Sequence, residues 1–97
     1  MDFSDLLAQD RRLVILRFLL EDQDRTLNTS ILQDALDQIG HGCSRDCVET
    51  ECAWLAEQRL VQIDRVGPVT VVTLTGRGQD VAEGKATVPG VKRPRAR

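Results

Sequence analysis

Residues 41–52, HGCSRDCVETEC, hold the single histidine and all three cysteines of this 97-residue chain. Imidazole and thiolate groups gathered so closely are typical ligands of structural zinc, and thiols near the start of a helix can also do redox chemistry. Structural zinc needs four ligands that converge on one point. The spacing of these residues therefore decides whether a metal ion can bind.

Helical geometry separates the thiols from one another. Ser44 is a good N-cap, and we expect a helix to run from it to about residue 59, turning by about 100° per residue. Cys52 then lies in the apolar core stripe that begins at Val48, whereas Cys47 points about 140° away from Cys52. One tetrahedral metal ion cannot easily bind both thiols.

His41, Cys43 and Cys47 remain as candidate ligands, but a fourth ligand is missing. We therefore predict no metal and no cofactor, with the cysteines packed as small buried residues. A mild redox role for Cys43 and Cys47 stays open, because a helix N-terminus can lower the pKa of a thiol. With one histidine, no phosphate-binding loop and no convincing pair of catalytic carboxylates, the sequence predicts that the protein is not an enzyme.

The composition is typical of a small cytoplasmic protein. Hydrophobic residues make up 41% of the chain and charged residues 29%, which is usual for a soluble domain. No apolar run approaches the ~20 residues of a membrane helix, and the opening MDFSDLL lacks the basic start of a signal peptide. Three cysteines cannot all pair in disulfides, so we expect a reducing cytoplasm. The lack of a membrane helix predicts that there is no membrane partner.

Two helices are predicted before the cysteine cluster. The first follows Ser4, a plausible N-cap, and continues through the apolar positions of LLAQDRRLVILRFLLED. Asn28 is expected to cap the second, which ends at Gly40, and residues 25–27 are a candidate lone strand before it. The core-facing residues of the second helix are expected to be Ile31, Leu32, Ala35, Leu36 and Ile39.

Only residues 40–43 separate the second helix from the third, and two amphipathic helices joined by so tight a turn form a helix-turn-helix. After the third helix, the spacing of apolar residues changes from a helical to a strand-like period. The stretch LVQIDRVGPVTVVTLT is rich in β-branched residues and predicts a hairpin with strands near residues 60–66 and 69–74. The fold class is therefore α+β and mostly helical, a winged helix-turn-helix in which the hairpin is the wing.

A closing helix and a basic tail complete the predicted chain. Thr75 is expected to cap a short helix that Gly84 stops, so that residues 1–84 form the winged domain. Residues 85–97, KATVPGVKRPRAR, contain two prolines and have little to bury. This composition predicts a flexible or loosely docked tail.

The stretch VETECAWLAEQRLVQIDRVGPVTVVTLTGRGQDVAEG resembles the end of many bacterial winged-helix regulators. In those proteins a helix ending in L-x-x-x-x-L-V leads into the wing and then into L-T-x-x-G. The matching residues here are Leu55, Leu60, Val61, Leu74, Thr75 and Gly78. With its flanking segments, most of the chain is similar to the small winged-helix proteins of Mu-like prophages, which are grouped loosely with ArsR- or MarR-type regulators. The resemblance implies a DNA-binding transcription regulator of a phage or prophage.

The resemblance does not extend to metal sensing. ArsR-type metal sensors resemble one another in a C-x-C motif on the recognition helix. This chain has Cys43-x₃-Cys47-x₄-Cys52 in its place. The metal-binding role of that family is therefore not implied here.

The charge pattern indicates which residues would contact double-stranded DNA. The net charge of −2 is distributed as −2 over residues 1–25, −4 over residues 26–60 and +4 over residues 61–97. Arg45 and Thr50, on the exposed face of the third helix, are expected to read bases in the major groove. The bases expected to hold phosphates are Arg65 near the wing tip, Arg77 at the closing helix, and Lys92, Arg93, Arg95 and Arg97 in the tail.

The third helix also favours a different hypothesis. Its exposed face is expected to carry Arg45, Asp46, Glu49, Thr50, Ala53 and Glu57. One base against three acids repels phosphates, so a non-catalytic winged-helix module with a protein partner at this helix is the alternative. Trp54 is then either an exposed anchor for that partner or a residue of the core or of a subunit contact. The broad apolar first helix favours a homodimer.

Overall fold

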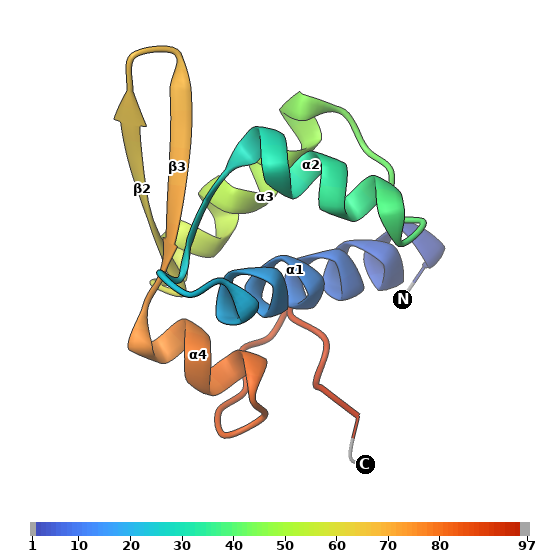
Figure 1. Ribbon diagram of the computed structural model, residues 1–97. Helices are drawn as coiled ribbons and strands as arrows, with labels where there is room; N and C mark the ends of the chain where they lie inside the picture. Colours follow the sequence, from blue (N-terminus) through green and yellow to red (C-terminus); the bar gives the residue numbers. More distant parts are fainter. Residues whose placement is uncertain (1, 96–97) are drawn as a thin grey trace.

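The computed structural model describes residues 2–95, as four helices packed against a three-stranded antiparallel sheet (Figure 1). The helices are α1 (Phe3–Glu21), α2 (Thr29–Gln38), α3 (Arg45–Glu57) and α4 (Gly76–Ala82), and the strands are β1 (Thr26–Asn28), β2 (Val61–Val66) and β3 (Val69–Leu74). In Figure 1, α1 crosses the middle of the molecule, α2 and α3 lie above it, and α4 lies below. The predicted α+β class with a winged helix-turn-helix is confirmed.

Side-chain caps set the starts of α2, α3 and α4, as the sequence predicted. Each cap accepts a hydrogen bond from the backbone N–H three residues later, and the caps are Asn28, Ser44 and Thr75. α1 differs, because the carboxylate of Asp2 accepts from the N–H of Asp5 at 2.9 Å and the helix begins at Phe3. Aspartate caps a helix as well as serine does, so the predicted Ser4 cap is wrong.

The strand before α2 is not alone. β1 pairs antiparallel with β3, and Leu27 lies opposite Val72. The strand starts one residue later than predicted, because Arg25 has a φ of 58°, outside the extended region. The sheet order β1–β3–β2 therefore places β3 in the centre and joins the wing to the start of α2.

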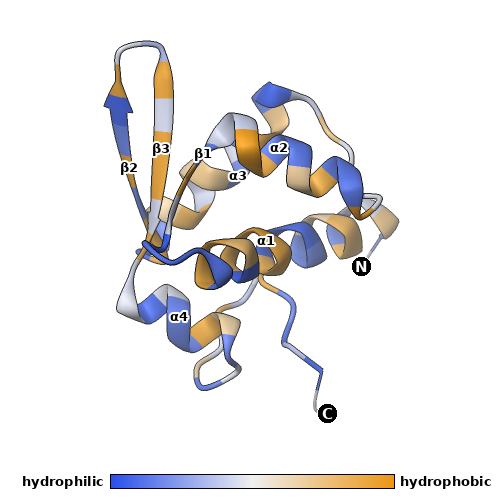
Figure 2. Ribbon diagram, in the orientation of Figure 1, coloured by the Kyte–Doolittle hydropathy of each residue, from blue (hydrophilic) through white to orange (hydrophobic). Residues whose placement is uncertain are grey.

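The predicted hairpin is confirmed. β2 and β3 pair in register from Val61 opposite Leu74 to Val66 opposite Val69, which leaves two residues for the turn. The base of the hairpin is buried, whereas Val66 and Val69 beside the turn are 65% and 42% exposed. Figure 2 shows apolar segments of both strands next to the turn, at the outer end of the hairpin. The wing thus extends from the core and presents an apolar tip.

The apolar face of α2 is only partly buried. Leu32 and Leu36 are fully buried and Ala35 is half-buried, as predicted. Ile31 and Ile39, expected in the same face, are 48% and 50% exposed. The contact surface of α2 is narrower than its apolar face, so the isoleucines near the two helix ends lie outside it.

The end of the chain is more closely packed than the sequence indicated. Val88 and Val91 are 5% and 7% exposed and belong to the hydrophobic core. The backbone N–H of Lys92 donates to the carbonyl of Gln9 on α1 at 3.2 Å. The prediction of a loosely docked tail with little to bury is therefore wrong for this segment, because its two valines provide the apolar surface that packs.

Candidate nucleic-acid interface

One side chain of α2 holds the start of α3. Gln33 donates through Nε2 to the carbonyl of Cys43 at 3.2 Å, and its Oε1 accepts from Nε of Arg45 at 2.8 Å. Arg45 is the first residue of α3 and is exposed. A neutral partner therefore positions this guanidinium at the first turn of α3 without compensating its charge.

α3 exposes the face that the sequence predicted. Arg45, Asp46, Thr50, Ala53 and Glu57 are exposed, and Glu49 is half-buried. The opposite face of the helix contributes Val48, Cys52 and Leu55 to the core. The exposed face of α3 is thus available to a ligand, but it carries more negative than positive charge.

The outer part of the wing comes near this same face. Arg65 donates through Nη1 to Oγ1 of Thr70 at 3.0 Å and lies 3.9 Å from the carboxylate of Glu49 on α3. Its side chain is 72% exposed, so this ion pair is weak. Glu49 follows Arg45 by four positions on α3, so the two side chains lie on the same side of the helix.

Arg77 lies elsewhere. It donates through Nε to the carbonyl of Gln58, just beyond the C-terminal end of α3. α3 has 13 residues, and a helix of that length is about 20 Å long. Arg77 is therefore about one helix length away from Arg45.

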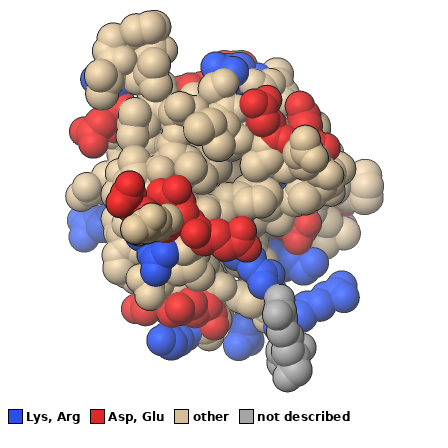
Figure 3. Space-filling model, in the orientation of Figure 1, with Lys and Arg blue, Asp and Glu red and all other residues tan. Residues whose placement is uncertain are grey.

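The bases near the end of the chain are also far from the wing tip. Lys92, Arg93 and Arg95 follow the core residue Val91, on a segment that leaves α1 on the side opposite the hairpin turn (Figure 1). In Figure 3 the blue side chains gather in this lower part, while the upper part shows mainly red and uncharged residues. Arg97 lies outside the described residues. The structure thus places Arg65 of the wing near Glu49 of α3, the helix that also carries Arg45 and Thr50, and separates the C-terminal bases from this helix.

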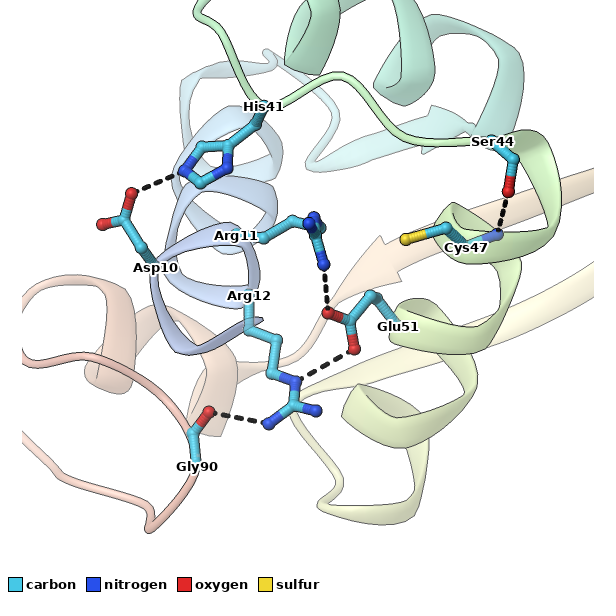
Figure 4. A network of polar contacts seen from close by, with 8 residues as sticks. All are labelled: Asp10, Arg11, Arg12, His41, Ser44, Cys47, Glu51 and Gly90. Carbon is cyan, nitrogen blue, oxygen red and sulfur yellow. Dashed lines mark hydrogen bonds and ion pairs between the residues drawn. The ribbon is translucent and has the colours of Figure 1, made fainter. Parts of the chain in front are cut away.

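Sequence reasoning missed a buried acid on α3. Glu51 is 6% exposed, and its carboxylate accepts from Nη1 of Arg11 at 3.2 Å and from Nε of Arg12 at 3.0 Å (Figure 4). These two ion pairs join α3 to α1. A signal was present, because Glu51 follows Val48 by three positions and precedes Leu55 by four, which places it within the core stripe. An acid in that stripe needs a buried partner.

Arg12 also connects α3 to the C-terminal segment. Its guanidinium lies 4.1 Å from the centre of the Trp54 ring, and its Nη1 donates to the carbonyl of Gly90 at 3.0 Å. Trp54 is half-buried against the core, so the core interpretation of this residue holds and the exposed-anchor interpretation is wrong.

His41 pairs with an acid of α1. Its Nε2 lies 2.6 Å from Oδ2 of Asp10, and Nζ of Lys92 lies 3.3 Å from Oδ1 of the same carboxylate. Burial raises the pKa of Asp10, but the hydrogen bonds from His41 and Lys92 outweigh it and hold that pKa below its ordinary value. Within residues 2–95, no three His, Cys, Asp or Glu side chains are placed to hold a metal ion.

The thiol of Cys43 is not activated in the way the helix start suggested. Burial, and then the hydrogen bond to Cys47, raises the pKa of Cys43 to about 12. Burial also raises the pKa of Cys52 to about 12. The expected lowering of a thiol pKa is wrong for Cys43, because this residue precedes the helix and desolvation dominates there.

We expect Cys43 and Cys52 to react slowly with a thiol reagent at pH 8 in the folded protein. The thiolate is the nucleophile, and a pKa near 12 leaves very little of it. Thiol titration of single-cysteine variants measures each rate, and the same variants unfolded in guanidinium provide the rate of an unprotected thiol. A folded-state rate for Cys43 equal to its unfolded rate would contradict this prediction.

Comparison with known proteins adds a phage context. No protein-family model matches the chain. It is 58% identical over 94 residues to the uncharacterized protein gp26 of Escherichia phage Mu, and the match covers 97% of each protein. The chain belongs to the family of phage Mu gp26. An uncharacterized protein of Haemophilus influenzae is 47% identical over 66 residues, which is 68% of this chain and 64% of that protein.

Among solved structures, the chain is similar to a MarR family transcriptional regulator from Streptomyces coelicolor, with a TM-score of 0.64 and 25% identity. The match covers 74% of this chain and 47% of the regulator, so it spans about half of that protein. This Mu gp26 relative therefore has a MarR-like winged-helix fold, as the sequence predicted. No helix within residues 2–95 has the length and apolar character that a membrane span requires.

Proposed function

We propose that this protein binds double-stranded DNA through α3 and the wing, as a transcription regulator of a phage or prophage. The observation that carries the proposal is the likeness of the fold to that of a MarR family transcriptional regulator, with Arg45 and Thr50 exposed on α3 and Arg65 exposed on the wing. The proposal assigns no catalysis and no cofactor to the protein. It places the protein in the host cytoplasm, where thiols stay reduced.

In this proposal α3 enters the major groove with its first turns. Arg45 is held there by Gln33, and an arginine can donate two hydrogen bonds to O6 and N7 of a guanine. Thr50 lies five residues further along, or about 7.5 Å along the helix axis, and contacts a base or phosphate farther along the groove. Arg65 on the wing contacts a phosphate beside the groove.

Because α3 carries acids, such binding would depend on specific contacts more than on electrostatic attraction between this helix and the DNA phosphates. Asp46 and Glu49 lie beside Arg45 and repel phosphates, although either can accept a hydrogen bond from the amino group of a cytosine. A homodimer would double the number of base contacts and match a two-fold operator. Phe3 and Leu6, which are 73% and 53% exposed at the start of α1, are available for a subunit contact.

Selection of bound duplexes from a random pool with the purified full chain tests the proposal. We expect one sequence to be enriched, and Arg45→Ala to weaken its binding by about 10- to 100-fold, the range for one good base contact. Lys85→Ala is the matched control, because Lys85 is an exposed base beyond α4. A pool without enrichment, or equal losses in the two variants, would reject the proposal.

A protein-interaction module is the second candidate, and a specific observation favours it. The exposed face of α3 is acidic, and the wing tip beside it presents Val66 and Val69 to solvent. Such a surface fits a basic, partly apolar protein surface better than it fits phosphates. This candidate gains support if duplex selection fails and Val66→Asp abolishes co-purification of a protein that the wild-type chain retains from infected cells.

A further inference from the structure

A hollow lies between α1 and the C-terminal segment, away from the wing. It has a volume of about 210 Å³ and is lined by Asp10, Leu13, Arg17, Lys92, Arg93 and Arg95. Four of the six residues are bases and one is an acid. This concentration of positive charge contrasts with the net charge of −2 of the whole chain.

The single acid in the hollow is already paired. Asp10 contacts His41 at 2.6 Å and Lys92 at 3.3 Å. Within the described part of the chain, no carboxylate lies within ion-pair distance of Arg17 or Arg93, and both are exposed. The charges of these two arginines are therefore available to an anion from outside the molecule.

The bases of the hollow are held in place and do not belong to a free tail. Arg12 donates to the carbonyl of Gly90, and Gly90 lies so close to the Trp54 ring that an added Cβ would be 2.7 Å from it. Val91 is buried, and the backbone of Lys92 is hydrogen-bonded to α1. These contacts fix the direction of the segment, so its bases lie beside Arg17 before any ligand binds. An anion would thus meet a preorganised site.

We propose that this hollow is a second phosphate-binding site, which takes the phosphodiester backbone of a nucleic-acid segment other than the one that α3 reads. The choice of a nucleic acid as the polymer rests on the proposed function. The claim that the hollow takes a different segment from the one at α3 rests on the fold, because the C-terminal segment and the hairpin turn lie on opposite sides of α1 (Figure 1).

The chemistry of the lining matches phosphate. Three of the four bases are arginines, whose planar guanidinium groups donate paired hydrogen bonds to phosphate oxygens. Arg17 approaches from α1, and Arg93 and Arg95 approach from the C-terminal segment, so a phosphate in the hollow meets donors from two sides. Leu13, which is buried, is the one apolar side chain of the lining.

Titration of the ¹⁵N-labelled full chain with inorganic pyrophosphate, followed by nuclear magnetic resonance, locates the site. We expect saturable shifts at the amides of Arg17, Lys92 and Arg93, and their loss in Arg17→Gln/Arg93→Gln. Arg59→Gln/Lys85→Gln removes two exposed bases outside the hollow and should keep the shifts. Shifts centred on α3 and the wing, or no saturable shift, would overturn the proposal.

The salt dependence of binding to a random-sequence duplex tests the nucleic-acid assignment. Each phosphate contact contributes about 0.9 to the slope of log K against log salt concentration, so Arg17→Gln/Arg93→Gln should reduce the slope by about 2. The Arg59→Gln/Lys85→Gln control should keep the wild-type slope. If the pyrophosphate shifts occur but the slope does not change, the hollow binds free polyphosphate and the assignment to nucleic acid is overturned.

The two proposals can fail separately. If duplex selection enriches no sequence, the proposal that α3 reads a DNA sequence is rejected. If the salt slope still falls in Arg17→Gln/Arg93→Gln, the proposal that the hollow binds phosphate is supported all the same. If binding to an operator depends on Arg45 but the salt slope is unchanged in Arg17→Gln/Arg93→Gln, the nucleic-acid assignment of the hollow is rejected and the proposed function is supported. Thermal unfolding of each variant confirms that these exposed substitutions leave the fold intact.

Discussion

Replacing Glu51 with glutamine is expected to lower the free energy of unfolding by about 3 kcal/mol. The carboxylate of Glu51 is shared by Arg11 and Arg12, and the three side chains are only 8–19% exposed. Removal of the negative charge leaves two half-buried guanidinium groups without a counter-charge. Buried charges that lose their partner cost far more than exposed ones, because water does not reach them.

The surroundings of Arg11 give no substitute partner. Its Nε is buried and has no hydrogen-bond partner within the described residues, so this side chain depends on Glu51 for its one ion pair. Urea unfolding, monitored by the fluorescence of Trp54, measures the loss. Glu57→Gln is the control, because Glu57 is an exposed acid on the same helix and should change stability by at most about 0.5 kcal/mol. Equal stabilities of the two variants would show that the pairing of Glu51 contributes nothing.

The second large effect is expected for Gly78→Ala, at about 3 kcal/mol of destabilisation. A Cβ on Gly78 would lie 2.0 Å from the carbonyl oxygen of Leu60 and 2.7 Å from Cδ1 of Leu74. The first of these atoms belongs to the backbone and cannot rotate away. α4 would therefore have to move off the start of the wing, where the N–H of Thr75 donates to the same carbonyl.

Gly76→Ala is a matched control within the same helix. A Cβ on Gly76 meets nothing within 4 Å, and its backbone conformation is accessible to alanine. Alanine also favours helix, so this substitution should leave stability unchanged or raise it by about 0.5 kcal/mol. Thermal and urea unfolding compare the two variants directly. A Gly78→Ala protein as stable as Gly76→Ala would mean that α4 and the wing do not approach so closely in solution.

Gly78 also gives a physical reason for the L-T-x-x-G motif, which the sequence offered only as a resemblance to other winged-helix proteins. The L-T-x-x-G pattern comprises Leu74, Thr75 and Gly78. Thr75 caps α4 by accepting from the N–H of Gly78, and Gly78 allows α4 to approach the carbonyl of Leu60. The motif thus allows α4 to begin at Thr75 and to pack closely against the backbone at the start of the wing.

Most of the fold was predictable because it depends on neighbours in the chain. Asn28, Ser44 and Thr75 cap their helices through bonds to residues three positions away, and the hairpin follows from a local run of β-branched residues. Errors arose where two local signals competed or where burial was partial. Asp2 replaced Ser4 as a cap, and Ile31, although on the apolar face of α2, is half exposed.

The candidate interface was predictable only in part. The exposed face of α3 follows from its core stripe, so Arg45 and Thr50 were placed correctly at its surface. Which bases accompany them depends on how distant segments pack. Arg65 lies near Glu49 because the wing folds over α3, whereas Arg93 lies on the other side of α1.

The sequence by itself determined the winged helix-turn-helix and the burial of Cys52 in the core stripe of α3, because helical periodicity, caps and turns act over a few residues. Only the tertiary structure decided that Glu51 would be enclosed by arginines 39 and 40 positions away, and that Arg12 would hold Gly90 across 78 positions. Those contacts depend on which surfaces meet when α1, α3 and the C-terminal segment pack together. They convert a stretch that reads as a free basic tail into one wall of a charged hollow.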